Sequence, residues 1–250
     1  MLEIKKLTRR FGGLEALQEL SLNFQAQKIA AIIGPNGAGK TTLLNAISGL
    51  YPADEGEIYF FGQSISQLPP HQIAQLGINR TFQQVQLFPN LNVLENVMVG
   101  LHPRTKSGFL SGLFHLPRAR AEERWIRKQA EEALAFFGLL TKADWPATSL
   151  SMAEQKKVEM ARALANEPKL LMLDEPVAGL NLREMEAMAA TLLKLKEKGQ
   201  TIVLVEHNMD LVMSIADWVI VLNHGTKIAE GVPAEVQRNE RVIAAYLGSG

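Results

Sequence analysis

Eight consecutive residues near the start of the chain, 34–41, have the sequence GPNGAGKT. They fit the pattern G-x-x-x-x-G-K-[ST], in which the backbone N–H groups of a glycine-rich loop surround phosphate oxygens. Glycine suits such a loop because it turns tightly and presents no side chain to the anion. In this pattern Lys40 reaches the terminal phosphates, and the hydroxyl of Thr41 ligates Mg²⁺. The pattern therefore predicts a nucleoside triphosphate site.

The residues on both sides of this loop support that prediction. The apolar run Ile29–Ile33 is typical of a buried strand, and residues 41–47 are typical of a helix. The N-terminus of such a helix carries roughly half a positive charge and would face the phosphates. A glycine-rich turn before an ordinary helix is the alternative, and the loop alone does not choose among P-loop NTPases. The residues expected to contact the nucleotide here are Gly34, Pro35, Asn36, Gly37, Ala38, Gly39, Lys40, Thr41 and Thr42.

A pair of acidic residues forms the second chemical feature. Residues 170–173 are apolar and are followed directly by Asp174 and Glu175. Open α/β sheets bind ligands at the carboxyl ends of their strands, so acids at such an end indicate a ligand site. Asp174 is suited to hold Mg²⁺ through a coordinated water, and Glu175 is suited to polarise an attacking water. A solvated turn before Pro176 is the alternative.

The elements that must position these groups alternate between short β-like runs and helical patterns, which predicts an α/β fold. Three N-terminal runs without intervening helices predict an antiparallel β subdomain that packs on a parallel P-loop NTPase core. Residues 92–166 have a helical pattern and predict an inserted helical lobe. We expect a single ATP-binding domain over 1–250, in which residues 1–91 and 167–250 form the core and the β subdomain. The expected strands include 2–7, 20–24, 57–61, 170–173, 201–205 and 218–222, with a helix over 182–198.

Composition narrows the class further. The 250 residues are 47% hydrophobic, which is enough to bury a substantial core, and 26 Lys and Arg balance 26 Asp and Glu. This balance provides no broad attraction to nucleic acid or to an anionic membrane. The absence of cysteine excludes disulfides and thiolate metal sites. We see no signal peptide and no apolar run near the ~20 residues that span a bilayer, so we expect membrane contact only through a protein partner.

Residues 149–155 (SLSMAEQ), which precede the acidic pair, resemble the signature motif of ABC-type ATPases. The resemblance covers nearly the whole chain and implies several roles. Phe11 corresponds to the aromatic residue that stacks on adenine, and Gln83 to the glutamine between the lobes that contacts metal and water. Residues 178–181 correspond to the loop that joins opposite active sites, and His207 to the switch histidine that contacts the γ-phosphate.

Each of these residues also has an ordinary structural interpretation. Phe11 could fill a core, Gln83 could cap a turn, and His207 could make a satisfied polar contact. Gln84 is a weaker alternative to Gln83. The joint order of the motifs along the chain favours the functional interpretation.

The resemblance implies a hydrolase that uses ATP and Mg²⁺ and works as a pair. In this family, two ATP-binding subunits, identical or paralogous, close head to tail on two ATP molecules, and water then attacks the γ-phosphate in line. Ser151 would contact the nucleotide held by the partner subunit. The expected catalytic residues are Glu175, His207 and Gln83. The expected metal contacts are Thr41, Gln83 and Asp174.

The signature departs from the usual Leu-Ser-Gly-Gly-Gln pattern. Met152 and Ala153 occupy the glycine positions, and Glu154 replaces the glutamine. Ser151 and Glu154 also fit a capping box, S-x-x-E, so a helix is still expected to begin there. Because Glu154 brings a negative charge near phosphate and Met152 restricts close approach, we expect weaker ATP-driven closure than with glycines.

Three segments resemble the ATP-binding subunit of branched-chain amino acid uptake systems: residues 80–88, the insertion 101–125, and residues 242–248. This resemblance implies transmembrane permease subunits as partners, a solute-binding protein as an indirect partner, and peripheral attachment to the cytoplasmic face of the membrane. Lipopolysaccharide and urea transporter ATPases share parts of the pattern. Within the insertion, packing in the helical lobe is favoured over a partner-facing surface for the apolar residues Phe109, Leu110, Leu113, Phe114 and Leu116.

Functions of other classes fit less well. A small GTPase or nucleotide kinase would share the phosphate loop, but the chain has no Asn-Lys-x-Asp sequence to read guanine. A non-membrane ABC ATPase acting on ribosomes or DNA usually carries paired cassettes or long coiled-coil insertions. A regulatory subunit with negligible hydrolysis is suggested only by the altered signature.

Overall fold

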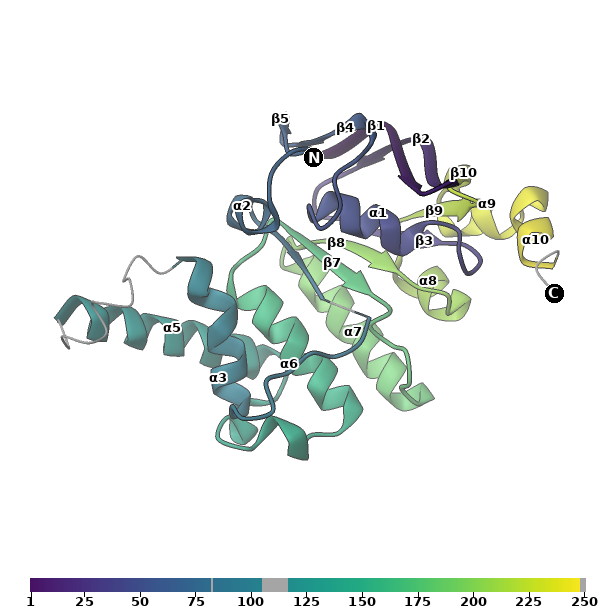
Figure 1. The fold of residues 1–250 in the computed structure, drawn as a ribbon. Helices are drawn as coiled ribbons and strands as arrows, with labels where there is room; N and C mark the ends of the chain where they lie inside the picture. The colour runs from purple at the N-terminus through teal and green to yellow at the C-terminus, as the bar shows by residue number, and fades with distance from the viewer. Residues whose placement is uncertain (82, 105–116, 248–250) are drawn as a thin grey trace.

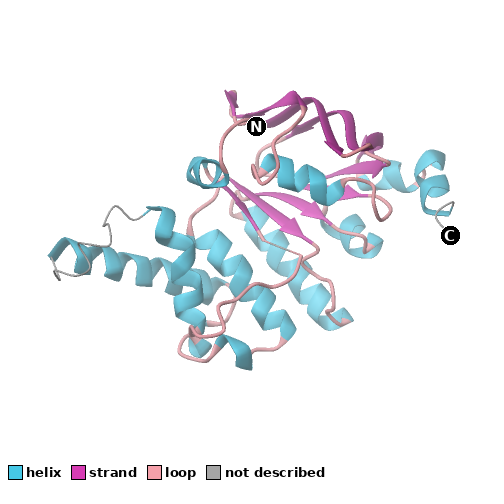
Figure 2. Cartoon of the chain, in the orientation of Figure 1, coloured by secondary structure: helices cyan, strands magenta, loops and turns pink. Residues whose placement is uncertain are grey.

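The computed structural model describes residues 1–81, 83–104 and 117–247. The N-terminal strands lie at one end of the molecule and α3, α5 and α6 at the other, with the second sheet and its helices between them, as Figures 1 and 2 show. The strands are β1 (Leu2–Phe11), β2 (Leu14–Phe24), β3 (Ile29–Ile33), β4 (Glu55–Phe60), β5 (Gln63–Ser64), β6 (Ile78–Arg80), β7 (Leu170–Asp174), β8 (Thr201–Val205), β9 (Trp218–Asn223) and β10 (Thr226–Gly231).

The longer helices lie in two groups, one around the parallel sheet and one in the region between β6 and β7. The helices are α1 (Lys40–Ile47), α2 (Pro70–Leu76), α3 (Val93–Met98), α5 (Pro117–Phe136), α6 (Met152–Ala165), α7 (Leu182–Glu197), α8 (Met209–Ile215), α9 (Pro233–Gln237) and α10 (Glu240–Leu247). Short 3₁₀ helices are η1 (Val99–Arg104), η2 (Leu140–Lys142) and η3 (Ala147–Ser149).

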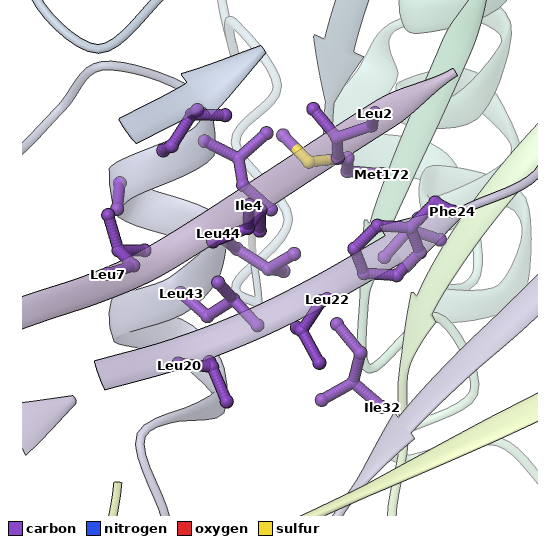
Figure 3. Packing of buried hydrophobic residues seen from close by; sticks show 14 of the residues in the cluster. Leu2, Ile4, Leu7, Leu20, Leu22, Phe24, Ile32, Leu43, Leu44 and Met172 are labelled. Atoms are coloured by element: carbon purple, nitrogen blue, oxygen red, sulfur yellow. The ribbon is translucent and has the colours of Figure 1, made fainter. Parts of the chain in front are cut away.

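The N-terminal strands form an antiparallel sheet in the order β2-β1-β4-β5. Side chains alternate across it, so that Leu20, Leu22 and Phe24 of β2 are buried while their neighbours are exposed. Figure 3 shows these buried side chains packed against Leu43 and Leu44 of α1. The antiparallel β subdomain predicted from the sequence is confirmed.

The second sheet has the order β10-β9-β3-β8-β7-β6, and it is parallel except for the β9–β10 pair. All five residues of β3 are buried, as expected for a parallel strand covered on both faces. Ile32 packs toward α1 and the antiparallel sheet, whereas Ile29 packs in the cluster that contains α6 and α7. The predicted α/β fold with a P-loop core is therefore confirmed.

The register of the parallel strands aligns the functional segments. Ile32 of β3 and Asp174 of β7 both lie opposite Val205 of β8. The three strands therefore end at the same edge of the sheet. The phosphate loop, the acidic pair and the segment with His207 all leave the sheet from this edge.

Two features of the fold were not expected from the sequence. Strand β6 has only three residues, too few for a periodic pattern, yet it pairs with β7 and brings Thr81 and Gln83 toward the edge at which β7 ends. Strand β10 forms an antiparallel hairpin with β9 and is the outermost strand on the side of the sheet away from β6. The apolar residues of the insertion between 109 and 116 lie outside the described residues.

Candidate active site

The phosphate loop leads into α1 without a side-chain cap. Its N-cap residue is Gly39, with φ 97°, and no side chain bonds to the first-turn N–H groups there. A Cβ on Gly39 would lie 2.5 Å from the carbonyl oxygen of Ala16. A Cβ on Gly34 would lie 2.1 Å from that of Leu222. Both glycines are thus required by close backbone contacts, and the helix N-terminus stays available to an anion.

Lys40 is folded back onto the loop. Its Nζ donates to the carbonyl oxygens of Gly34, at 2.7 Å, and Pro35, at 2.8 Å. Burial lowers the pKa of Lys40, and the carboxylates of Glu175 and Asp174 oppose the shift. The ammonium group is therefore already partly desolvated beside the loop, which lowers the further desolvation cost of binding an anion there.

Asp174 is fully buried beside Arg80. The Nη2 of Arg80 donates to Oδ2 of Asp174 at 2.9 Å, while Nη1 donates to Oδ1 of Asn45 in α1 at 2.6 Å. Burial raises the pKa of Asp174, and the Arg80 guanidinium opposes this. Within the part of the chain that the structure describes, the second oxygen of Asp174, Oδ1, has no hydrogen-bond partner. This buried oxygen is suited to a water or a cation.

The carboxylate of Glu175 contacts two other predicted residues, Gln83 and His207. Its Oε2 accepts a hydrogen bond from Nε2 of Gln83 at 3.0 Å, and its Oε1 lies 3.3 Å from Nδ1 of His207. The side chain is only 15% exposed. Gln83 and His207, which are far from Glu175 in sequence, are therefore brought together around one carboxylate.

A cavity of about 570 Å³ joins Phe11 to the phosphate loop and to Glu175. The Phe11 ring is 40% exposed and packs edge-on against Tyr51, with centroids 5.6 Å apart. The Arg9 guanidinium lies 4.7 Å from the same ring centroid. The predicted residues that line this cavity are Phe11, Asn36, Gly37, Ala38, Gly39, Lys40, Thr41, Thr42, Gln83 and Glu175.

Ser151 is separate from this cavity and caps α6. The predicted capping box is confirmed: Glu154 N–H donates to Ser151 Oγ at 3.3 Å, and Ser151 N–H donates to Glu154 Oε2 at 3.1 Å. Lys142 Nζ donates to the other oxygen of Glu154 at 2.6 Å. The Lys142 ammonium lowers the pKa of Glu154. The charge of Glu154 is thus offset within its own subunit, which the sequence analysis did not anticipate.

Several residues of the site were missed from the sequence. The cavity is also lined by Leu14, Glu15, Ala16, Gln18 and His224. Their positions follow from the hairpins β1–β2 and β9–β10, so no local motif identifies them. Arg80 and Lys142 pair with acids distant in sequence, which only the folded chain reveals.

The C-terminal helix also reaches the phosphate loop. Burial raises the pKa of Tyr246 in α10, and a hydrogen bond with the backbone of Gly34 opposes the shift. The aromatic ring packs beside the cluster that contains Ala31 and Ile33 of β3. Helix α10 is therefore in contact, through Tyr246, with the strand and loop that carry the candidate nucleotide site.

A second cavity, of about 600 Å³, lies between α2, β6, η1, α6 and the segment that follows α1. Three of its lining side chains, Leu50, Phe88 and Val99, are large, apolar and substantially exposed. Arg162 of α6 donates to the carbonyl oxygen of Gln86 at 2.7 Å, which ties one wall of the cavity to the segment that follows Gln83.

Comparison with known families gives two matches. Residues 17–178 match the ABC transporter family, and residues 226–250 match the family of branched-chain amino acid ATP-binding cassette transporters. The chain is 42% identical over 249 residues to the high-affinity branched-chain amino acid transport ATP-binding protein BraF of Pseudomonas aeruginosa. That match covers 99% of this chain and 98% of its relative.

Solved structures agree. The ADP conformation of an ATP-binding cassette of an ABC transporter superposes with a TM-score of 0.87 at 34% identity, covering 100% of this chain and 99% of that chain. A dimeric cassette in a post-hydrolysis state, bound to ADP and Pi, superposes with a TM-score of 0.78 at 29% identity, covering 93% of this chain and 99% of that chain.

Proposed function

The chain belongs to the ABC transporter family of ATP-binding, ATP-hydrolysing cassettes, and from this premise we propose that it powers a membrane transporter that takes up branched-chain amino acids. The observation that carries the ATPase is the cavity that joins the phosphate loop to Glu175, with Gln83 and His207 around that carboxylate. The solute assignment is supported by the match over residues 226–250 and by the similarity to BraF.

Binding begins at the phosphate loop. The backbone N–H groups at the start of α1 and the ammonium of Lys40 would hold the β- and γ-phosphates. To do so, Lys40 exchanges its two carbonyl acceptors for phosphate oxygens. Phe11 stands at the other end of the same cavity, with an exposed ring, and would stack on adenine.

Hydrolysis would depend on Glu175 as the general base. A water oxygen attacks the γ-phosphorus in line while the bond from that phosphorus to the bridging oxygen breaks, and ADP leaves with that electron pair. The water proton passes to the Glu175 carboxylate. Gln83 orients the carboxylate and the water, and His207 stabilises the transferred phosphoryl group. The three side chains would therefore act together around the attacking water and the γ-phosphate.

The site residues also fit Mg²⁺. Asp174 presents a buried oxygen without a partner among the described residues, and Thr41 and Gln83 supply neutral oxygens, the hard ligands that Mg²⁺ takes alongside phosphate and water. When bound, the ion would neutralise charge that develops on the phosphate oxygens. Arg80 keeps Asp174 in place through its bond to the other carboxylate oxygen.

We infer a head-to-tail dimer in which Ser151 of one subunit reaches the nucleotide of the other. The second subunit is a copy of this chain or a paralogue. Ser151 Oγ accepts the Glu154 N–H but keeps its own O–H, which can donate to a γ-phosphate. The segment 178–181, which ends in the N-cap residue of α7, would lie at the same interface.

The permease would attach at the second cavity. Among the described residues, no helix has the length and apolar character to span a bilayer. In the proposed transporter, the permease subunits would form the translocation pathway. Exposed Leu50, Phe88 and Val99 offer them an apolar contact, next to the segment that carries Gln83. The chain would thus sit at the cytoplasmic face of the membrane, with a solute-binding protein as an indirect partner.

This attachment has a direct test. We expect Phe88→Asp to abolish recovery of the permease with the tagged chain while ATP binding persists. Phe61→Asp is the matched control, because Phe61 is similarly exposed but lies at the edge of the antiparallel sheet. Full permease recovery with Phe88→Asp would place the contact elsewhere.

The transporter itself is tested with the intact complex. The tagged chain is recovered from membranes, its partner subunits are identified, and the complex is reconstituted in vesicles. We expect leucine, isoleucine or valine, with the solute-binding protein, to stimulate ATP hydrolysis and accumulate inside. Stimulation by urea alone, lipopolysaccharide transport, or recovery with ribosomes would each contradict the proposal.

A further inference from the structure

The turn that follows β7 is held by two buried side chains of opposite charge. Lys156 of α6 donates from Nζ to the backbone carbonyl oxygen of Glu175 at 2.8 Å. On the other side, Oε1 of Glu206 accepts the N–H of Val177 at 3.1 Å. Lys156 is 6% exposed and Glu206 is 1% exposed. Lys156 and Glu206 therefore hydrogen-bond to the backbone at the two ends of a three-residue segment, Glu175 to Val177.

The Glu206 carboxylate also binds the backbone of residues 207 and 208, the switch segment that carries His207. Its second oxygen, Oε2, accepts the N–H of His207 at 3.1 Å and the N–H of Asn208 at 3.4 Å. One buried carboxylate thus joins the backbone of the acidic turn to the backbone of His207. A glutamine at 206 would present only one oxygen and would place an amide N–H₂ against a backbone donor.

The turn from Glu175 to Val177 carries backbone strain at Glu175. Glu175 has φ 51°, a left-handed conformation that non-glycine residues rarely adopt. Such a conformation persists only where the surrounding contacts enforce it, and it is often found at active sites. Here the enforcing contacts are the Glu175 N–H donated to Val205 O at 2.9 Å, the Lys156 bond to its carbonyl, and the Glu206 bond two residues later.

The charges of Lys156 and Glu206 do not stabilise the hydrophobic core. A buried charge costs stability unless it is paired and hydrogen-bonded, and apolar residues commonly replace such groups without loss. Burial lowers the pKa of Lys156, and the nearby carboxylates of Glu159, Glu206 and Glu175 oppose this. The charges of Lys156 and Glu206 are therefore best explained by the backbone geometry that they impose.

We propose that Lys156 and Glu206 are positioning residues that hold Glu175 and His207 in the arrangement for hydrolysis and connect the signature helix, the acidic turn and the switch segment. The proposal rests on the assigned role of Glu175 in ATP hydrolysis. Lys156 lies on the helix that Ser151 caps, so movement of the signature on dimer closure would reach the Glu175 carbonyl through the Lys156 side chain.

The test compares Lys156→Met and Glu206→Gln with the parent in the reconstituted transporter. We expect each variant to lower kcat by at least about tenfold and to leave KM for ATP within about threefold, because positioning acts on the chemical step. Lys156→Arg keeps a cationic donor and should recover most of kcat. The double variant should lose little more than the worse single variant, because the two residues act on one turn.

Asp217→Asn is the matched control. Asp217 also accepts two hydrogen bonds, from the N–H of Ile29 at 2.9 Å and from Nζ of Lys196 at 3.0 Å. It lies where β3 and β9 begin, at the other end of the parallel strands from Glu175. This variant should keep the parental kcat. A loss of kcat with Asp217→Asn equal to that of Glu206→Gln would assign the effect to general destabilisation and overturn the proposal.

Amide hydrogen exchange tests the geometry independently of turnover. In the isolated chain without nucleotide, Glu206→Gln should accelerate exchange at Val177 and His207 together, and Lys156→Met should do so at Val177. Unchanged exchange, or variants within twofold of the parental kcat, would overturn the proposal. A parent that binds ATP but does not hydrolyse it would instead contradict the proposed function, and the exchange measurement would still decide the positioning.

Discussion

The helices α1 and α6 begin in opposite ways, although both N-termini are assigned to phosphate. Helix α1 begins at Gly39, whose lack of a side chain leaves the first-turn N–H groups to a ligand. Helix α6 begins at Ser151, and a capping box with Glu154 already uses the N–H groups of both residues. The α1 N-terminus has no side-chain cap, whereas two N–H groups at the α6 N-terminus are bonded by side chains of the same motif.

This difference indicates that the two helix N-termini contribute differently to nucleotide binding. In the proposed function the open end, with Lys40 beside it, would bind the polyphosphate strongly. The capped end offers one hydroxyl, from a rigid helix start, and so contributes less binding energy and more orientation. Weaker closure than with glycines is still expected, but for a revised reason: Met152 and the occupied N–H groups limit the contact, while Lys142 offsets the charge of Glu154.

The largest expected effect separates binding from chemistry. We expect Glu175→Gln to bind ATP as the parent does but to lower turnover by at least ~10²-fold, because the general base is lost. ATP affinity and single-turnover hydrolysis measure the two quantities. Near-parental hydrolysis by a clean sample would refute the role of Glu175.

The next effect tests the open end. We expect Lys40→Ala to weaken nucleotide affinity by about 10- to 100-fold, since a hydrogen bond to a charged group contributes about 1.5–3 kcal/mol. Lys128→Ala, which removes an exposed lysine of α5, should leave the affinity unchanged. Calorimetric titration with ATP and Mg²⁺ provides the measurement, and unchanged affinity with Lys40→Ala would contradict the assignment.

A smaller effect is expected at the capped end. Replacing Met152 and Ala153 by glycine and Glu154 by glutamine should tighten ATP-driven dimerisation by about fivefold, equivalent to about 1 kcal/mol. Sedimentation in the Glu175→Gln background, where we expect slow hydrolysis to leave ATP bound, measures it. No change in dimerisation and ATPase rate would show that the altered signature has no such cost.

The smallest effect concerns Lys142 and pH. Because the pKa of Glu154 is lowered in the folded chain, its pairing stabilises the fold above the unfolded pKa of about 4.3 and is lost as the pH falls through the lower folded pKa. Solvent screening limits the contribution of this partly exposed pair to about 1 kcal/mol or less. Urea unfolding of Lys142→Met should therefore differ from the parent at pH 7 and converge with it in acid; a gap that widens in acid would contradict this.

The sequence was informative where function depends on residue types at short, fixed spacing. The phosphate loop, the acidic pair and the S-x-x-E capping box are local patterns, and the alternation of strands and helices predicted the α/β fold. The edge at which these segments meet followed from the general behaviour of parallel strands.

Contacts between distant residues were not predictable in the same way. Arg80 and Asp174 are 94 positions apart, and Val177 and Glu206 are 29 apart. Such pairs depend on strand register and on how loops pack, which periodicity does not encode. Glu206 did carry one local signal, because it follows the buried strand β8 just as Glu175 follows β7.

The most direct measurement is the affinity of the monomeric chain for ATP with Mg²⁺, compared between the parent and the signature variant Met152→Gly/Ala153→Gly/Glu154→Gln. If α1 alone holds the polyphosphate, the two monomers bind ATP with the same affinity and differ only in dimerisation. A well-folded parent that does not bind ATP, even together with its permease subunits, or a monomer affinity that changes with the signature, would contradict the account.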